Sequence, residues 1–381
     1  MHVQNAKRRF FLEKRPGSIN SYTAHAAGGF LLANSGTSTP PFQPRRVFFE
    51  QRAMAYPLAQ ELYDRFTADK VPIRMIESHN RVTGIPGGTP QIAYREAKRT
   101  LVVGVKVGLE FDTCRPSADY EFAMGTSCPG GCQYCYLATT LGRKPYVRVY
   151  VNIDEILASI KRHIEARLPE TTSFEASSTS DPLAVEHLTG NLGRAITFFG
   201  QQEHGLLRLT TKFHLVDSLL NLPHNERTRF RFSVNSEKII TTYEQQTAAL
   251  SERLTAAAKV ARAGYPLGFV IAPLFLYPGW QHDYGKMLDK LHAALETINP
   301  AGDNLTFELI QHRFTKSAKR VILERFPHTS LDLNEENRMY KWGKYGRGKY
   351  VYPKEAAQKL EQYMNAEIMR RFPQAKVEYF T

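Results

Sequence analysis

The pattern of hydrophobic and polar positions alternates between strand-like and helix-like segments from about residue 42 onward. Residues 101–111 (LVVGVKVGLEF) form a β-branched run that is typical of a buried strand. Further strands are expected at residues 120–124, 173–176, 206–211, 229–234, 267–272 and 305–310. The stretches between them are long enough for crossover helices, so the pattern predicts an α/β fold with about six βα units, a partial parallel (β/α)6 barrel.

Two of the expected helices carry signals at their ends. Between residues 152 and 168, aliphatic residues fall on one helical face, and Asn152 followed by Glu155 resembles a capping box. An alanine-rich segment, residues 254–263, ends at Gly264, which suits a left-handed cap, and a Tyr-Pro pair then blocks further helix. Each helix precedes an expected strand, as the alternating order requires.

The first forty residues do not continue this alternation. They combine basic, small and turn-forming residues without a sustained period, so residues 1–41 are expected to be a flexible leader, either an added tail or a basic arm. We expect an N-terminal α/β extension over residues 42–112 and the barrel core over residues 113–325. A C-terminal hairpin and helix are expected over residues 326–381.

Composition narrows the range of partners and compartments. The 381 residues include 50 lysines and arginines against 37 aspartates and glutamates, a formal charge of +13, so polyanions are attractive partners. A merely basic protein without such a partner is the alternative. No apolar run approaches the ~20 residues of a membrane span. Only four cysteines occur, and three of them are crowded together, which favours a reducing cytoplasm over a disulfide framework.

The three crowded cysteines form the most specific motif. Cys128, Cys132 and Cys135 follow an expected strand in the stretch CPGGCQYCY, where a proline and two glycines let the backbone curl. Structural zinc takes four ligands, and Cys114 or a histidine would have to supply the fourth. Three thiolates on a four-iron cluster would instead leave one iron open to a substrate or cofactor. Spacing alone leaves both readings open.

The spacing C-x3-C-x-aromatic-C resembles the signature of the radical S-adenosylmethionine enzymes, with Tyr134 as the aromatic residue. This resemblance implies a 4Fe-4S cluster held by Cys128, Cys132 and Cys135. It also implies that S-adenosyl-L-methionine binds the open iron and is cleaved to a 5′-deoxyadenosyl radical, and that Tyr134 lines the adenine site.

A narrower resemblance covers nearly the whole chain after the leader. The stretches CQYCYLATTLGRKPY, FEASSTSDP, TTKFH, TRFRFSVN, YPLGFVIAP, LTFELIQHRFTK and KWGKYGRGKYVYP look like the spore photoproduct lyase family. The resemblance implies a DNA repair lyase that reverses the spore photoproduct, 5-thyminyl-5,6-dihydrothymine, to two thymines by a 5′-deoxyadenosyl radical mechanism. The implied partners are double-stranded DNA containing the lesion and an electron donor such as a flavodoxin or ferredoxin. We expect a monomer in the cytoplasm of a bacterial spore.

The same resemblance assigns the catalytic residues. Tyr134 and Tyr136 are implied to pass hydrogen between the cofactor and a cysteine in the family's motif FEASCTSDP, where this chain has Ser178. An alcohol O–H bond is far stronger than a thiol S–H bond, so serine cannot take over the donor step. We therefore expect the final hydrogen return to be impaired by Ser178, a substitution of engineered or natural origin. The alternative role of the two tyrosines is packing and adenine contact.

The resemblance also implies a cofactor-binding set at the ends of the expected strands. Its members are Tyr136, Ser180, Asp181, Lys212, Ser233 and Ala272. A lysine can pair with the methionyl carboxylate, whereas hydroxyls and a carboxylate can hold ribose. Each residue type also has an ordinary role, because serines cap helices and lysines cover surfaces.

The stretch KWGKYGRGKYVY, residues 341–352, alternates cations with aromatic residues, and its three glycines suit a tight hairpin. The candidate DNA-binding residues are Lys341, Trp342, Lys344, Tyr345, Arg347 and Lys349. The cations would neutralise phosphates, and the aromatic rings would wedge between bases once the lesion is turned outward. Further positive charge is expected from Arg229, Arg231, His312, Arg313, Lys316, Lys319 and Arg320. A plain exposed hairpin is the alternative.

Overall fold

The computed structural model describes residues 38–298, 305–342 and 348–381. Its strands are β1 (Arg46–Glu50), β2 (Ile73–Ile76), β3 (Thr100–Gly104), β4 (Asp112–Thr113), β5 (Tyr120–Phe122), β6 (Gly125–Thr126), β7 (Gly131–Cys132), β8 (Val147–Tyr150), β9 (Thr172–Ala176), β10 (Gly205–Thr211), β11 (Thr228–Val234), β12 (Glu244–Gln245), β13 (Leu267–Leu274), β14 (Thr306–Gln311), β15 (Met339–Trp342), β16 (Gly348–Val351) and β17 (Lys376–Phe380). Its α-helices are α1 (Pro57–Ala68), α2 (Pro90–Lys98), α3 (Tyr136–Thr140), α4 (Ile153–Glu165), α5 (Glu186–Thr189), α6 (Asn191–Gly200), α7 (Glu237–Tyr243), α8 (Leu250–Arg262), α9 (Trp280–Leu295), α10 (Lys316–Arg325) and α11 (Lys354–Arg371). Short 3-10 helices are η1 (Gln51–Ala55), η2 (Pro182–Val185) and η3 (Asp217–Leu219).

A curved sheet forms the centre of the fold, with strand order β17-β14-β13-β11-β10-β9-β5-β4. The six strands from β5 to β14 run parallel to one another, β17 continues them in parallel beside β14, and β4 pairs antiparallel with β5. These six strands match the expected ones to within about two residues, so the partial parallel barrel is confirmed.

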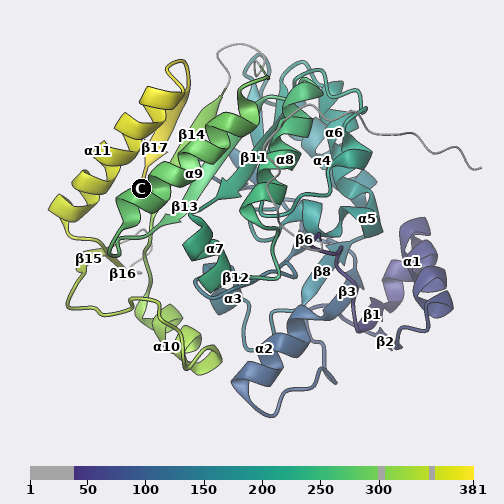
Figure 1. Cartoon of the computed structure of the whole chain (residues 1–381). Helices are drawn as coiled ribbons and strands as arrows, with labels where there is room; N and C mark the ends of the chain where they lie inside the picture. Colours follow the sequence, from purple (N-terminus) through teal and green to yellow (C-terminus); the bar gives the residue numbers. More distant parts are fainter. Residues whose placement is uncertain (1–37, 299–304, 343–347) are drawn as a thin grey trace, which may run out of the picture. The chain divides into compact units, whose positions relative to one another are not determined.

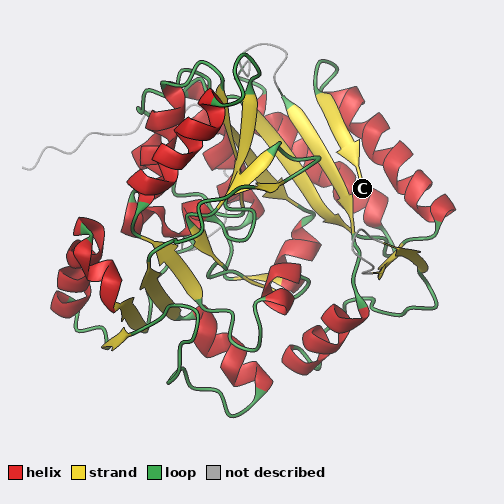
Figure 2. Ribbon diagram, turned by 180° about the vertical axis from the view of Figure 1, so that it is seen from behind, coloured by secondary structure: helices red, strands yellow, loops and turns green. Residues whose placement is uncertain are grey.

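Helices α4, α6, α8, α9 and α11 cover the outer face of this sheet (Figures 1 and 2). Their apolar faces and the strands share one hydrophobic core, in which Ile160, Ile196 and Val260 are fully buried. Burial of such a side chain contributes roughly 1.5–3 kcal/mol, so a large part of the folding free energy comes from the packing of these helices on the sheet. The inner face of the sheet and the carboxyl ends of its strands are left for polar residues.

A second sheet of five strands, in the order β2-β1-β3-β8-β6, packs against α1 around a separate apolar cluster. Strands β6 and β8 belong to the stretch that was expected to lie wholly in the barrel core. The sheet therefore joins the N-terminal extension to the segment between residues 125 and 150. The expected domain boundaries stay predictions, and residues 1–37 of the expected leader lie outside the described residues.

Two expectations about local structure were wrong in detail. The strand expected over residues 101–111 ends at Gly104, because side chains replace its sheet partners: Glu50 accepts from Val105 N at 3.0 Å and Asn152 accepts from Lys106 N at 2.8 Å. Since Asn152 Oδ1 is used in this way, the expected capping box does not form, although α4 does begin at Ile153. The expectation for Gly264 is confirmed, with φ at +84° just after α8.

The C-terminal part contains the β15–β16 hairpin and helix α11, both of which the sequence predicted, followed by strand β17. Helix α11 lies beside α9 on the outside of the barrel (Figure 1), and β17 returns the chain to the sheet. Among the described residues, no helix is both long enough and apolar enough to span a bilayer.

Candidate active site

The cysteine loop is held at the carboxyl end of the barrel from two sides. On one side, β7 pairs with β12, so that Cys132 lies opposite Glu244. On the other, Ser127 forms a bridge with Ser180, and its N–H donates to Thr179 O at 2.8 Å. The loop turns tightly: a side chain on Gly130 would approach both Thr247 and the Cys128 sulfur. The glycines of the motif therefore allow the three sulfurs to gather.

The donor set fits an iron–sulfur cluster. Cys132 is buried, Cys128 and Cys135 are half-buried, and burial raises the pKa of Cys128 and Cys132, whereas Lys98 lowers that of Cys128. Lys98 is itself buried and donates to the Cys128 carbonyl at 2.8 Å. One lysine does not offset the burial of these thiols, so thiolates here require the positive charge of bound iron. In the described part of the chain, no three Cys, His, Asp or Glu side chains converge on one ion, and a cluster that takes each thiolate on a separate iron does not need them to.

The Tyr134 phenol belongs to a polar network that is centred on the buried carboxylate of Glu244. The phenol donates to Glu244, which also binds Lys212 Nζ at 2.8 Å and Arg253 Nη2 at 2.6 Å. Lys212 Nζ lies 3.1 Å from the Tyr134 oxygen and 3.5 Å from the Ala272 carbonyl. Burial alone would raise the pKa of Glu244, but Lys212 and Arg253 outweigh it and hold the pKa at about 2. Glu244 is thus an anion at neutral pH that orients a phenol and a lysine.

Two further expected cofactor residues, Asp181 and Ser233, line the ends of neighbouring strands. Asp181 is buried and accepts from Thr211 Oγ1 and from Lys212 N, both at 2.8 Å. Burial raises its pKa to about 6, despite these hydrogen bonds. Ser233 is buried at the end of β11, where its carbonyl accepts from Arg253. The structure therefore brings Asp181, Ser233 and Lys212 to one edge of the barrel.

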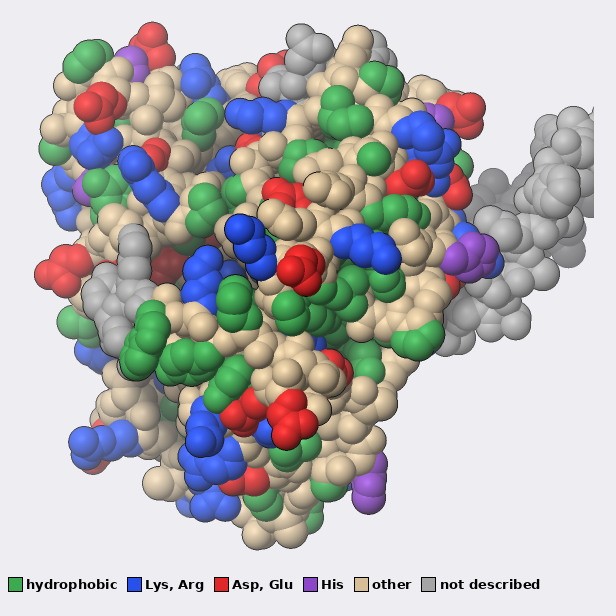
Figure 3. Space-filling model, turned by 90° about the vertical axis from the view of Figure 1, so that its left-hand side faces the viewer, with side chains coloured by type: hydrophobic (Ala, Val, Ile, Leu, Met, Phe, Trp, Pro, Cys, Tyr) green, Lys and Arg blue, Asp and Glu red, His purple; other side chains and the backbone are tan. Residues whose placement is uncertain are grey.

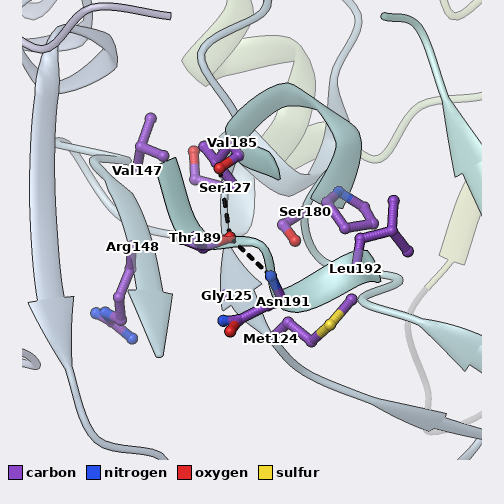
Figure 4. A pocket seen from close by; sticks show the side chains of 11 residues that line it. Met124, Gly125, Ser127, Val147, Arg148, Ser180, Val185, Thr189, Asn191 and Leu192 are labelled. Carbon is purple, nitrogen blue, oxygen red and sulfur yellow. Dashed lines mark hydrogen bonds between the residues drawn. The ribbon is translucent and has the colours of Figure 1, made fainter. Parts of the chain in front are cut away.

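Ser180 faces a small cavity next to this edge, between the second sheet and the η2–α6 segment (Figure 4). Met124, Arg148, Thr189 and Asn191 also line it, and Thr189 and Asn191 are joined by a hydrogen bond. The cavity holds about 10 Å³, roughly one water molecule. It is too small for S-adenosyl-L-methionine and is not the cofactor site.

A second polar cluster lies on the open side of the loop. Tyr136 is the first residue of α3 and is 65% exposed, unlike Tyr134 two positions earlier, which is half-buried. Ser178, two residues beyond the end of β9, donates its hydroxyl hydrogen to Glu121 on β5. The Cys114 thiol is hydrogen-bonded to the same Glu121. The phenol of Tyr136 lies within electrostatic reach of Cys135, Glu121 and Cys114.

The C-terminal hairpin is attached near this cluster. Phe314, just after β14, pairs with Tyr350 through two backbone hydrogen bonds of 3.1 and 2.7 Å, and the two rings stack with centroids 5.3 Å apart. Trp342 is 72% exposed at the far end of β15, with its ring against that of Tyr340. On the face that carries α10, α11 and the hairpin, basic side chains lie in patches among exposed hydrophobic ones (Figure 3). Lys344, Tyr345 and Arg347 lie outside the described residues.

Cations gather along the strands of the hairpin. Lys341 and Lys349 are paired across its strands. Partial burial and the charges of Arg313 and Lys341 lower the pKa of Lys349. Arg313 also lies within electrostatic reach of Tyr136, so the cations of the hairpin and the open side of the cysteine loop face the same space. An anion placed there would relieve the repulsion among these cations.

Comparison with known proteins identifies the family. Residues 42–381 match the family model described as spore photoproduct lyase. The chain belongs to this family. It is 53% identical over 341 residues to the spore photoproduct lyase of Geobacillus sp. (strain Y412MC61) and 51% identical over 341 residues to that of Bacillus subtilis (strain 168). Each alignment covers 90% of this chain and 99% of the relative.

Solved structures of spore photoproduct lyase have the same fold as this chain. A complex with dinucleoside spore photoproduct is 52% identical, with a TM-score of 0.87, and covers 90% of this chain and all of that chain. A double mutant, in which one cysteine is replaced by alanine and one serine by cysteine, carries AdoMet and dinucleoside spore photoproduct, with the same identity, coverage and TM-score.

Two residues that were expected to supply positive charge in this family member do not. Arg231 is fully buried in the barrel, where it pairs with Glu175 and Glu308. His312 is buried, and burial together with Arg338 lowers its pKa to about 3, so the ring is neutral. Sequence shows positive side chains but not their burial. Lys319 is half-buried and pairs with Glu335 at 3.0 Å.

Sequence reasoning missed several residues that shape this lyase site. They are Lys98 beside the cysteine loop, Glu244 and Arg253 behind it, and Glu121 on its open side; Cys114, named above only as a possible zinc ligand, lies near Glu121. Each is a single charged or thiol-bearing residue without a motif of its own. The one available signal was position, because Cys114 and Glu121 flank the strand that leads into the cysteine motif.

Proposed function

We propose that this chain is a DNA repair lyase that reverses the spore photoproduct to two thymines, with a 4Fe-4S cluster and S-adenosyl-L-methionine. The observation that carries the proposal is the pinned three-cysteine loop at the carboxyl end of a partial barrel, in a chain 52% identical to a structure with bound AdoMet and dinucleoside spore photoproduct. A single-metal role does not account for the tyrosines and cations around the loop.

We assign the cluster-binding and cofactor-binding roles to the following residues. Cys128, Cys132 and Cys135 would hold the cluster. S-adenosyl-L-methionine, when bound to the reduced cluster, would supply the radical chemistry that takes a hydrogen atom from the lesion. Asp181, Ser180, Ser233 and the Ala272 backbone would hold its ribose and adenine, and Lys212 its carboxylate. Because Lys212 is paired with Glu244 in the structure, we expect it to keep that partner and to share its remaining N–H donors.

Tyr134 and Tyr136 have different environments that suit different tasks. The Tyr134 O–H points to Glu244, and burial followed by the Glu244 charge raises its pKa well above the usual value, so the phenol keeps its hydrogen. Tyr136 is exposed on the substrate side. We propose that Tyr134 contacts the cofactor and that Tyr136 meets the substrate side of the hydrogen path.

We propose double-stranded DNA as the physiological substrate, with the hairpin as the wedge. Lys341 and Lys349 would face the phosphates, and Trp342 would fill the gap left by the everted lesion. A flavodoxin or ferredoxin would supply the electron, to a monomeric enzyme in the cytoplasm of a spore. The relatives from Bacillus subtilis and Geobacillus are consistent with a spore-forming source.

Anaerobic reconstitution tests the proposal. The chain should bind iron and sulfide, release 5′-deoxyadenosine on reduction and convert dinucleoside spore photoproduct to thymine-containing product. Cys132→Ala should lose both iron and 5′-deoxyadenosine, whereas Cys114→Ala should keep its full iron content as the matched cysteine control. A protein that binds one zinc and no sulfide, or one that cleaves the cofactor but leaves the lesion closed, would refute the proposal.

A further inference from the structure

We infer that Tyr94 is a cluster-binding residue of this chain, whose phenol donates a hydrogen bond to sulfide of the iron–sulfur cluster and so makes the cluster easier to reduce. The inference rests on the proposed function, because it needs a cluster in the cysteine loop. It adds to the three thiolates a hydrogen-bond donor from helix α2, which lies outside the cysteine motif.

The Tyr94 side chain is buried without a partner for its hydroxyl group. Tyr94 lies on α2, and only 6% of the residue is exposed. Within residues 38–298, 305–342 and 348–381, its oxygen has no hydrogen-bond partner. A buried hydroxyl in this position gives up its hydrogen bonds to water and gains none in return, so such groups are rare in folded proteins. The phenol is therefore free to donate to a bound group.

The thiols of the cysteine loop lie near this phenol. Cys135, Cys132 and Cys128 are all within electrostatic reach of the Tyr94 hydroxyl, and Cys135 has the largest effect of the three. None of the three sulfurs accepts a hydrogen bond from it, so the phenol does not hold a cysteine in place. Sulfide bound between irons is the acceptor that a cluster on these cysteines would bring to this region.

Two buried cations and an aromatic ring hold the Tyr94 ring in place. Lys98 Nζ lies 5.5 Å from the centre of the ring, and Arg325 Cζ lies 4.9 Å from it. Phe326 packs edge-on against the same ring, with centroids 5.3 Å apart. These contacts involve the ring and not the hydroxyl group, so phenylalanine at position 94 should preserve the packing.

The same two cations bind both ends of the cysteine loop. Lys98 Nζ donates to the Cys128 carbonyl at 2.8 Å and to the hydroxyl of the preceding serine at 3.2 Å. Arg325, on α10, donates to the carbonyls of Ala138 and Gly142 at 2.5 and 2.6 Å. All of these acceptors are uncharged, and within the described part of the chain neither cation pairs with a carboxylate. Two buried positive charges of this kind suit an anionic neighbour.

The added charge of a reduced cluster gives this arrangement its effect. A cluster on three thiolates becomes more negative when it takes up an electron. Hydrogen bonds to its sulfurs and nearby positive charges therefore stabilise the reduced form more than the oxidised form. The Tyr94 donor thus raises the reduction potential in the same direction as Lys98 and Arg325, and an external electron donor reduces the cluster more readily.

The test compares the reconstituted chain with Tyr94→Phe and with the control Tyr265→Phe. Tyr265 is also buried, but its hydroxyl donates to Leu219 O at 2.5 Å, and it precedes β13 at the end of the barrel opposite to the cysteine loop. Both variants should keep their iron and sulfide. In a redox titration followed by electron paramagnetic resonance, Tyr94→Phe should shift the one-electron equilibrium about tenfold towards the oxidised form, as expected for a lost hydrogen bond to a charged group. That shift is a potential lower by about 59 mV. Tyr265→Phe should leave the potential unchanged.

A second measurement detects the hydrogen bond itself. After exchange into deuterium oxide, electron–nuclear double resonance of the reduced unchanged chain should show an exchangeable deuteron, coupled to the cluster, that is missing in Tyr94→Phe. An unchanged potential in Tyr94→Phe, or the same deuteron signals as in the unchanged chain, would overturn the inference. An equal shift of potential in Tyr265→Phe would also overturn it, because the effect would then not need a group at the cluster. Failure of every protein, the unchanged chain included, to bind iron and sulfide would refute the proposed function together with the inference.

Discussion

Replacing Glu244 with glutamine should destabilise this protein more than any surface change and should disturb the Tyr134 side of the site. The Glu244 carboxylate is fully buried between Lys212 and Arg253 and also accepts from Tyr134. Glutamine keeps the shape but removes the charge, so two buried cations lose their shared anion.

Two independent estimates of the free energy of unfolding lost in Glu244→Gln agree. Removal of one partner from a buried ion pair costs about 3–5 kcal/mol. A carboxylate whose pKa is 4.5 when unfolded and about 2 when folded stabilises the fold by about 3 kcal/mol at neutral pH. Arg253 keeps hydrogen bonds to Ala248 O and Ser233 O, which supports the lower end of the range. We expect a loss of about 3 kcal/mol.

Urea unfolding of the reconstituted protein, followed by circular dichroism, measures this loss. The control is Glu165→Gln on α4, an exposed carboxylate 3.8 Å from Lys161 whose removal should cost less than about 1 kcal/mol. Because the folded pKa of Glu244 is depressed, its contribution should be complete above about pH 4.5 and should disappear as the pH falls towards 2. A Glu244→Gln protein within about 1 kcal/mol of the unchanged chain, or one with the same stability profile between pH 5 and 3, would show that the network is not ionised as described.

Three further predictions concern the cluster, the DNA and the fold. Lys98→Met should lower the cluster's reduction potential, by about 60 mV for each ~1.4 kcal/mol of lost charge interaction, in a titration followed by electron paramagnetic resonance; an unchanged potential would mean that Lys98 only ties down the loop. Replacing Lys341, Lys344, Arg347 and Lys349 with glutamine should flatten the salt dependence of DNA binding by up to ~0.9 log unit per lost phosphate contact. The control is Lys161→Gln on α4, which should leave the salt dependence unchanged. If the quadruple variant also keeps the slope of the unchanged chain, the hairpin does not contact the DNA. Gly264→Ala should cost about 1–2 kcal/mol in urea unfolding because φ is +84°, and no loss would imply that the α8 cap relaxes.

Hydrophobic periodicity was enough to predict the barrel strands, and residue spacing was enough to identify the cysteine motif. The strands at β9, β10 and β11 are β-branched or alternating runs whose ends are marked locally by glycine, proline or polar residues, so neighbouring residues alone carry the signal. The motif likewise needs only eight consecutive residues, because all three thiols must meet within one loop. The hairpin's described strands were also predictable, from glycines and paired aromatic residues close in sequence.

Only the tertiary structure decided which of the isolated polar residues act together. Glu121 meets Ser178 because β5 pairs with β9, and Glu244 meets Lys212 and Tyr134 because β12 pairs with the cysteine loop. Such pairs form between segments far apart in the chain and have no period that a sequence displays. Burial has the same origin: Arg231 becomes a core ion pair only when the barrel closes around it. Local order follows from neighbouring residues, whereas the charges of the site follow from which strands lie side by side.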